Sequence, residues 1–144
     1  MEQIVRVTNQ TKHDLFHELA SQLSLPSLHI EDLVALSEIN DQGEMLALRL
    51  IGVFRQVAPK MLGDIEFFVL ANDRVGAAKQ LGVVEQASAR IGAKALASIC
   101  RAAIASCEAR APREEVIVRI TSIRAELERV NRDLTEISKL VVGF

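Results

Sequence analysis

Apolar side chains recur every three or four residues over most of the chain, which is the spacing of one face of an α-helix. The pattern is cleanest after Ala111-Pro112, where a heptad of apolar residues continues almost to the end of the chain. A heptad of this length predicts one long helix that buries a single stripe. The stripe consists of Val116, Ile120, Ile123, Leu127, Val130, Leu134 and Ile137.

A second long helix is predicted from Glu44 to about Leu70, after the turn-forming run Asn40-Asp41-Gln42-Gly43. Pro59 lies inside this segment and should kink the helix, because its ring clashes with the carbonyl four residues earlier. The apolar stripe predicted for this helix consists of Leu46, Leu50, Val53, Val57, Met61, Ile65 and Phe68.

A third helix is predicted from Asp73 to Ala93, with Asp73 as its N-cap and Gly92 at its end. One side of this helix forms an apolar seam. The opposite side carries small or polar residues, with Gly82 in mid-helix. A glycine there costs about 1 kcal/mol relative to alanine, and neither a turn nor a cap explains it. The seam consists of Ala77, Leu81, Val84, Ser88 and Ile91.

A fourth helix is predicted from Ala93 to about Ala109. Four long helices with short connections predict an all-α fold, an antiparallel up-down-up-down four-helix bundle. Two shorter helices, which begin near Thr11 and Ile30, should flank or cap it. We expect a single domain over residues 1–144, with an N-terminal extension at 1–25 and the bundle at 26–144. The inward-facing residues of the fourth helix are Leu96, Cys100, Ala103 and Cys107.

The composition excludes several classes of function. The chain is 49% hydrophobic with no Trp or Tyr and only five Phe, and its net charge is −2. Nucleic-acid-binding proteins usually present a basic patch or stacking aromatic side chains, so we expect no nucleic-acid partner. No window approaches the roughly 18 apolar residues of a membrane span, and the N-terminus lacks a signal pattern. We expect a cytoplasmic protein without membrane contact.

Few residues suit catalysis or metal binding. Cys100 and Cys107 are seven residues apart on one predicted helix, about 10 Å, which is beyond disulfide reach. We expect both to be reduced, inert core thiols. His13 and His17 have i, i+4 spacing, but HDLFH is not the zinc motif HExxH, and a solvated helix face is favoured. The sequence predicts no metal, no cofactor and no enzymatic activity.

The helix order over residues 29–140 resembles that of the histidine phosphotransfer (HPt) family of two-component relays. The family motif is Ala-His-x-Leu-Lys-Gly followed by two small residues, with an Asp nine residues before the histidine and a hydrophobic-Gly-Ala turn after it. Asp73 and Ile91-Gly92-Ala93 match the Asp and the turn in one register without a gap. In that register the phosphoaccepting histidine falls on Gly82, the lysine on Glu85 and the glycine on Gln86. The other matched positions are Leu81, Val84, Ala87 and Ser88, and they remain apolar or small.

The resemblance implies a phosphorylation-incompetent HPt-like domain, a pseudo-HPt. A glycine offers no imidazole, and Glu85 repels a phosphoryl group by about 1 to 4 kcal/mol at 4 Å where the lysine would steady it. The resemblance also implies docking of a receiver domain or a histidine kinase without phosphotransfer. Glu85 would then either mimic the charge of a phosphohistidine or weaken docking to an acidic receiver pocket. The implied docking face consists of Lys79, Gly82, Glu85, Gln86, Ala89 and Arg90.

Two further hypotheses remain open from the sequence. The chain is a structural or assembly protein, a homo-oligomer or a subunit of a larger complex, in which residues 1–25 matter most. Alternatively, it is an active phosphotransferase that uses another acceptor residue. His29 is a poor acceptor for this role, because it lies well outside the register of the motif.

Overall fold

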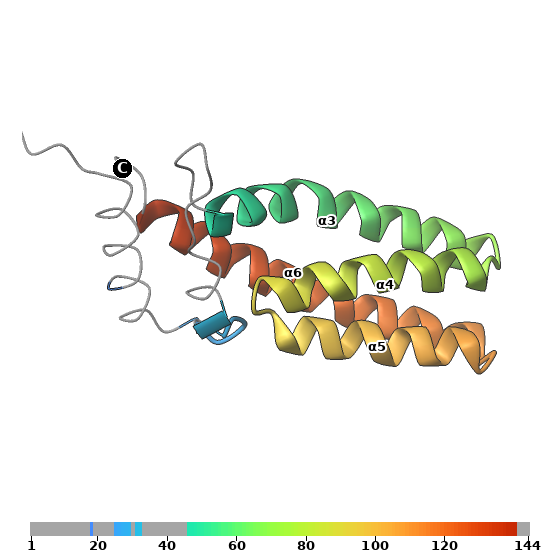
Figure 1. Ribbon diagram of the computed structural model, residues 1–144. Helices are drawn as coiled ribbons and strands as arrows, with labels where there is room; N and C mark the ends of the chain where they lie inside the picture. The colour runs from blue at the N-terminus through green and yellow to red at the C-terminus, as the bar shows by residue number, and fades with distance from the viewer. Residues whose placement is uncertain (1–17, 19–24, 30, 33–45, 141–144) are drawn as a thin grey trace, which may run out of the picture.

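The computed structural model describes residues 18, 25–29, 31–32 and 46–140, and four long α-helices make up most of this part of the chain (Figure 1). The described residues contain no strand, so the all-α class predicted from the sequence is confirmed. The predicted helices near Thr11 and Ile30 fall largely outside the described residues. The four helices are α3 (Leu46–Leu70), α4 (Arg74–Arg90), α5 (Lys94–Glu108) and α6 (Arg113–Leu140).

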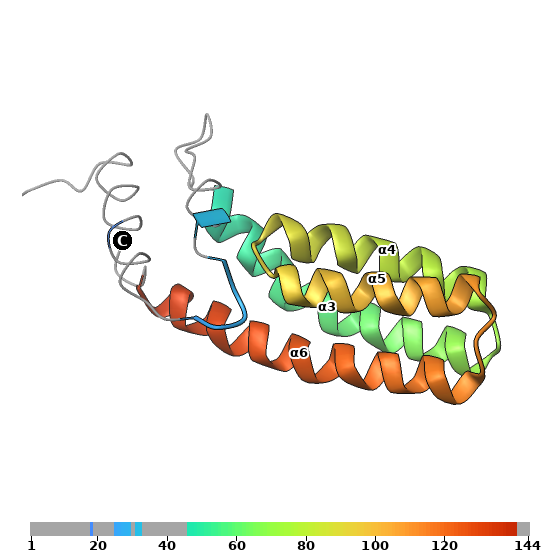
Figure 2. The same ribbon diagram turned by 90° about the horizontal axis from the view of Figure 1, so that it is seen from below.

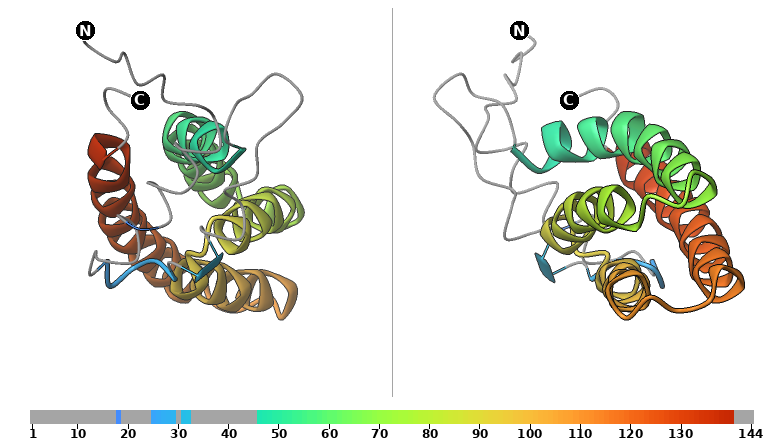
Figure 3. Two further views of the ribbon diagram at one scale, coloured as in Figure 1. Left: turned by 60° about the vertical axis from the view of Figure 1, so that its left-hand side comes forward. Right: turned by 90° about the vertical axis from the view of Figure 1, so that its right-hand side faces the viewer.

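Successive helices run in opposite directions, because only three or four residues connect each to the next (Figure 1, Figure 2). α3 packs on α4, α4 on α5, α5 on α6, and α6 on α3. The right-hand view in Figure 3 looks nearly along the helices and shows them around one centre. We call α3–α6 the bundle. None of the described helices combines the length and the hydropathy of a membrane span.

The core is built from the stripes predicted for α4, α5 and α6. The seam of α4, the inward residues of α5 and the heptad of α6 are all buried, and no member is more than 7% exposed. Each stripe lies on one face of its helix at the 3.6-residue period, so burial of that face selects the rotation of the helix. These predictions are confirmed.

The stripe predicted for α3 is wrong by about one residue. Of its seven members only Ile65 is fully buried, whereas Val53 and Val57 are 51% and 42% exposed. α3 has apolar residues on nearly every side, and two of its core positions are alanines that let neighbouring helices approach closely. The face of α3 that is buried therefore differs from the face that its larger apolar side chains predicted. The buried residues of α3 are Ala47, Ile51, Phe54, Ala58, Leu62, Ile65 and Val69.

Pro59 does not end α3, which continues on both sides of it. The proline is exposed, and its neighbour Ala58 is in the core. The chain reverses after Leu70 through Asn72, which adopts a left-handed conformation with φ 60°. Asp73 then caps α4 as predicted, because its carboxylate accepts a hydrogen bond of 2.9 Å from the Gly76 amide.

The turn between α4 and α5 requires Gly92 for two reasons. Its φ is +83°, a left-handed conformation that costs other residues about 1 to 2 kcal/mol. A Cβ at this position would also lie 2.6 Å from the His29 carbonyl oxygen. The His29 amide donates to the Gly92 carbonyl oxygen at 2.8 Å. The segment that contains residues 25–29 is therefore held directly against the α4–α5 turn.

The same segment also packs on α6. Leu25 and Leu28 are buried in the core, and the Ser27 amide donates to the Asp133 carboxylate at 3.1 Å. Asp32 pairs with Lys94 of α5 at 3.4 Å. Leu25, which we assigned to the N-terminal extension, therefore contributes side-chain packing to the bundle.

We expect opposite effects from alanine at two glycines. Gly92→Ala should lower the free energy of unfolding by about 2 kcal/mol, because it combines an unfavourable φ with a close backbone contact. Gly82→Ala should raise it by about 0.5 to 1 kcal/mol, since the new Cβ enters open space in mid-helix. Urea denaturation followed by circular dichroism measures both. A Gly92→Ala variant as stable as the wild type would contradict the role of this turn.

Candidate docking surface on α4

The residues implied for docking lie on the side of α4 that faces away from the core. Lys79, Gln86, Ala89 and Arg90 are exposed, and Gly82 is partly exposed among them. Their spacing of three and four residues places them on one helical face, opposite the buried seam. We call this set, with Glu85, the α4 face.

Gly82 has no structural reason to be a glycine. It lies inside α4, its φ is not positive, and a Cβ built on it would meet nothing within 4 Å. Gly92 shows the contrast, because both its φ and its contact with His29 require a glycine. The space beside Gly82 is therefore open to a side chain at this position or to a partner molecule.

Glu85 does not present an isolated negative charge. Its carboxylate lies 3.2 Å from the Arg101 guanidinium of α5, and the carboxylate is the more buried of the two partners. The pair turns Glu85 toward the α4–α5 interface rather than straight outward. Its charge is therefore largely offset, which disfavours the hypothesis that Glu85 mimics a phosphohistidine. Lys79 and Arg90 are the other charges of the α4 face, and both are positive.

An exposed apolar strip continues the α4 face toward α3. A Cβ on Gly76 would lie 3.0 Å from the Phe68 ring, so these two residues mark the sides on which α3 and α4 meet. On α4, Val83 follows Gly76 by seven residues, which is two helical turns to within about 20°. On α3, Val57 precedes Phe68 by eleven residues, which is three turns to within about 20°. Each valine therefore lies on the side of its helix that faces the other helix. Val83 is 49% exposed and Val57 is 42% exposed.

The two valines also lie at similar heights in the bundle. α3 and α4 are antiparallel, so a residue seven positions after Gly76 on α4 lies at the same height as a residue about seven positions before Phe68 on α3. Val57 is four residues further, which is an offset of about 6 Å. We call Val57 and Val83 the valine strip.

Sequence reasoning missed the valine strip because it placed Val57 in the core. The sequence of α3 contains a second apolar stripe, shifted by about one residue, that includes Ala47 and Ala58. This second stripe would have predicted the buried face correctly. The Arg101 partner of Glu85 was also missed. No sequence pattern links two residues on different helices, so only the packing of α4 on α5 brings them together.

The remaining nucleophiles are buried. Burial raises the pKa of the Cys100 thiol to about 12, with a smaller contribution from Glu85 that is opposed by Arg101. Burial also raises the pKa of Cys107. Both thiols are free, and protonated buried thiols are inert. The Ser88 hydroxyl donates to the Val84 carbonyl oxygen inside α4 at 2.7 Å.

The part of the chain that the structure describes contains no group of three or more His, Cys, Asp or Glu residues positioned for a metal ion. His13 and His17 lie outside the described residues. No protein-family model matches the chain, and no curated protein matches it either. The resemblance to HPt domains therefore stands on the helix order and on the anchors at Asp73 and Gly92.

We expect Cys100 to make stability pH-dependent in the alkaline range. Its pKa is about 12 in the folded chain and about 9 when unfolded, so the folded chain holds more protons between these values. The free energy of unfolding should therefore fall above about pH 9, by at most about 1.4 kcal/mol per pH unit from this group.

The measurement is urea denaturation from about pH 8 to about pH 11. Cys100→Ala should flatten the alkaline decline, because alanine does not titrate. The comparison of slopes cancels the titration of the lysines, which both proteins share. Equal slopes for the variant and the wild type would contradict the prediction.

Proposed function

We propose that this chain is a pseudo-HPt module, an up-down-up-down bundle of HPt type that docks a receiver domain or a histidine kinase without accepting phosphate. The observation that carries the proposal is the open, partly apolar surface around Gly82. It combines the α4 face with the valine strip, and no described side chain fills the space next to Gly82.

Exposed valines beside a helix face favour contact with another protein. Burial of one valine side chain is worth about 1.5 kcal/mol or more, and apolar patches of this kind mark interaction sites on many proteins. The rim is polar, as is usual at non-obligate interfaces. Lys79 and Arg90 make this rim positive, because Arg101 offsets Glu85. A positive rim complements the acidic pocket of a receiver.

Phosphotransfer is not part of the proposal, because the chemistry has no acceptor at the matched position. Gly82 carries no imidazole. Among the described residues the one histidine is His29, which hydrogen-bonds the Gly92 backbone. Gly92 is ten residues along the chain from Gly82, about 15 Å at the rise of a helix. His29 therefore lies too far from Gly82 to replace the missing acceptor.

A charged side chain at Gly82 should abolish docking. Gly82→Arg places a long cation in the open space that the proposal assigns to the partner, and the dissociation constant should rise at least about tenfold. Gly52→Arg is the matched control, because Gly52 also lies mid-helix with nothing within 4 Å of its Cβ. Gly52 lies on α3, away from the side that meets α4.

Titration calorimetry against a panel of receiver domains and kinase dimerisation domains measures the affinities. Val83→Asp should weaken binding to the same partner, since it places a charge in the valine strip. Equal affinities for wild type, Gly82→Arg and Val83→Asp would exclude this surface as the docking site. The absence of any binding partner in the panel would count against the proposal.

The wild type should take up no acid-labile phosphate from a phosphorylated receiver or kinase. The double variant Gly82→His/Glu85→Lys should take it up, because open space beside Gly82 leaves room for an exposed imidazole. Radiolabel transfer at neutral pH, followed by acid treatment, measures this. Label on the wild type would contradict the proposal and would favour an active phosphotransferase with another acceptor.

A further inference from the structure

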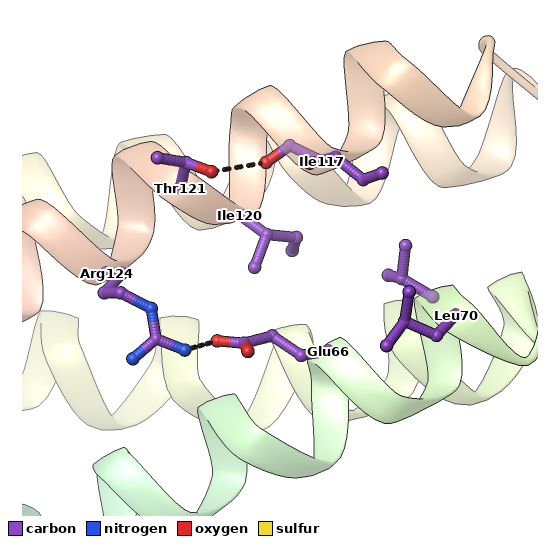
Figure 4. A pocket seen from close by; sticks show the side chains of 7 residues that line it. Glu66, Leu70, Ile117, Ile120, Thr121 and Arg124 are labelled. Carbon is purple, nitrogen blue, oxygen red and sulfur yellow. Dashed lines mark hydrogen bonds and ion pairs between the residues drawn. The ribbon is translucent and has the colours of Figure 1, made fainter.

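Among the described residues, two arginine–glutamate ion pairs join neighbouring helices of the bundle. One is the pair of Glu66 on α3 with Arg124 on α6, which lies at the lining of a groove between these helices (Figure 4). The groove has a volume of about 200 Å³ and a mostly apolar lining. The other is the pair of Glu85 on α4 with Arg101 on α5. The two pairs have similar chemistry but lie at different junctions of the bundle.

The Glu85–Arg101 pair lies beside the proposed docking surface. Glu85 follows Gly82 by three residues, so its side chain leaves α4 next to the open space at Gly82. The Nη1 group of Arg101 donates a hydrogen bond of 3.2 Å to the Oε1 atom of Glu85. The side chain of Glu85 is 23% exposed, and that of Arg101 is 59% exposed. The guanidinium is therefore the member of the pair that is more open to solvent and to a partner.

The charge of the docking surface depends on this pair. Lys79 and Arg90 of the α4 face are exposed, and neither has an ion-pair partner among the described residues. While Glu85 is paired, these two cations make the surface positive. Loss of the guanidinium would leave the Glu85 carboxylate as an unpaired negative charge beside Gly82. The positive charge of the surface would then fall at the place where the partner docks.

Arg101 has no other role in the part of the chain that the structure describes. Glu85 is its one hydrogen-bond and ion-pair partner there. Ion pairs between partly exposed side chains contribute little to stability, so the pair is a minor factor in folding. Unpaired like charges across an interface, in contrast, strongly disfavour a partner. The pairing of Glu85 therefore matters more for binding than for the fold.

We propose that Arg101 determines the charge of the partner that this surface accepts. This inference rests on the proposed docking function. Arg101 holds Glu85 in an ion pair and keeps the surface around Gly82 positive, so the surface complements a partner with an acidic face. Arg101 acts through Glu85 and is a positioning residue. The docking surface thus depends on α5 as well as on α3 and α4.

Titration calorimetry against receiver domains, whose pockets are acidic, tests the proposal. Arg101→Gln should raise the dissociation constant at least about threefold, because the unpaired carboxylate repels an acidic partner. The double variant Glu85→Gln/Arg101→Gln should bind within about twofold of the wild type, since it has no carboxylate to repel the partner. Arg101→Lys should also stay within about twofold, because one hydrogen bond to Glu85 requires a cation but not a guanidinium fork.

Arg124→Gln is the matched control. It removes the same charge and breaks the other arginine–glutamate pair, but it does so at the α3–α6 groove, away from α4. Its affinity for the receiver should equal that of the wild type. Thermal unfolding of each variant verifies that the fold is intact. Both arginine side chains are more than half exposed, so we expect the two single variants to remain folded.

Four results would overturn the proposal. Arg101→Gln could bind as tightly as the wild type or more tightly, or Arg124→Gln could weaken binding as much as Arg101→Gln does. The double variant could be as weak as Arg101→Gln, in which case Arg101 acts independently of Glu85. The wild type could bind no receiver. A wild type that binds neither a receiver nor a kinase domain would overturn the proposed function as well.

Discussion

Burial of the α6 stripe is the interaction on which the rest of the structure depends. Its seven residues are at most 6% exposed, and both α3 and α5 pack on that helix. α4 is attached chiefly through α3 and α5, by a narrow seam that includes Ala77 and Leu81. Because α4 needs only that seam for its attachment, the composition of its outer side is free of packing requirements. The bundle thus supports an outer side of α4 whose residues are mostly not required for packing.

The sequence predicts this arrangement well where one period dominates. In α4, α5 and α6 the most regular apolar spacing is the buried one, although these helices also carry other apolar residues such as Val83, Ile104 and Val118. α3 has two overlapping periods, and the larger residues Val53 and Val57 pointed to the wrong one. The side of α4 that carries Gly82 was predictable from that helix alone. The Arg101 partner, the valine strip and the α3–α6 groove were not, because each joins residues of separate helices whose contact only tertiary packing defines.

α3 presents sides with different surroundings. Its buried side holds it in the core, its α4 side carries the valine strip, and its α6 side carries the groove. The apolar residues of α3 thus extend beyond the face that this helix buries in the core. The error in the predicted stripe of α3 and the exposed apolar surface of this helix have the same cause, which is apolar residues outside its buried face. Apolar residues that do not serve the core remain available for contacts with other molecules.

The free space beside Gly82 has a consequence for how this chain evolves. A Cβ at position 82 would meet nothing within 4 Å, so substitutions there leave the packing of the bundle intact, and alanine is expected to stabilise the fold. Substitutions can therefore accumulate at position 82, or be reversed, without passing through unstable intermediates. Under the proposed pseudo-HPt function, the loss or recovery of an acceptor side chain at this position is uncoupled from the stability of the fold.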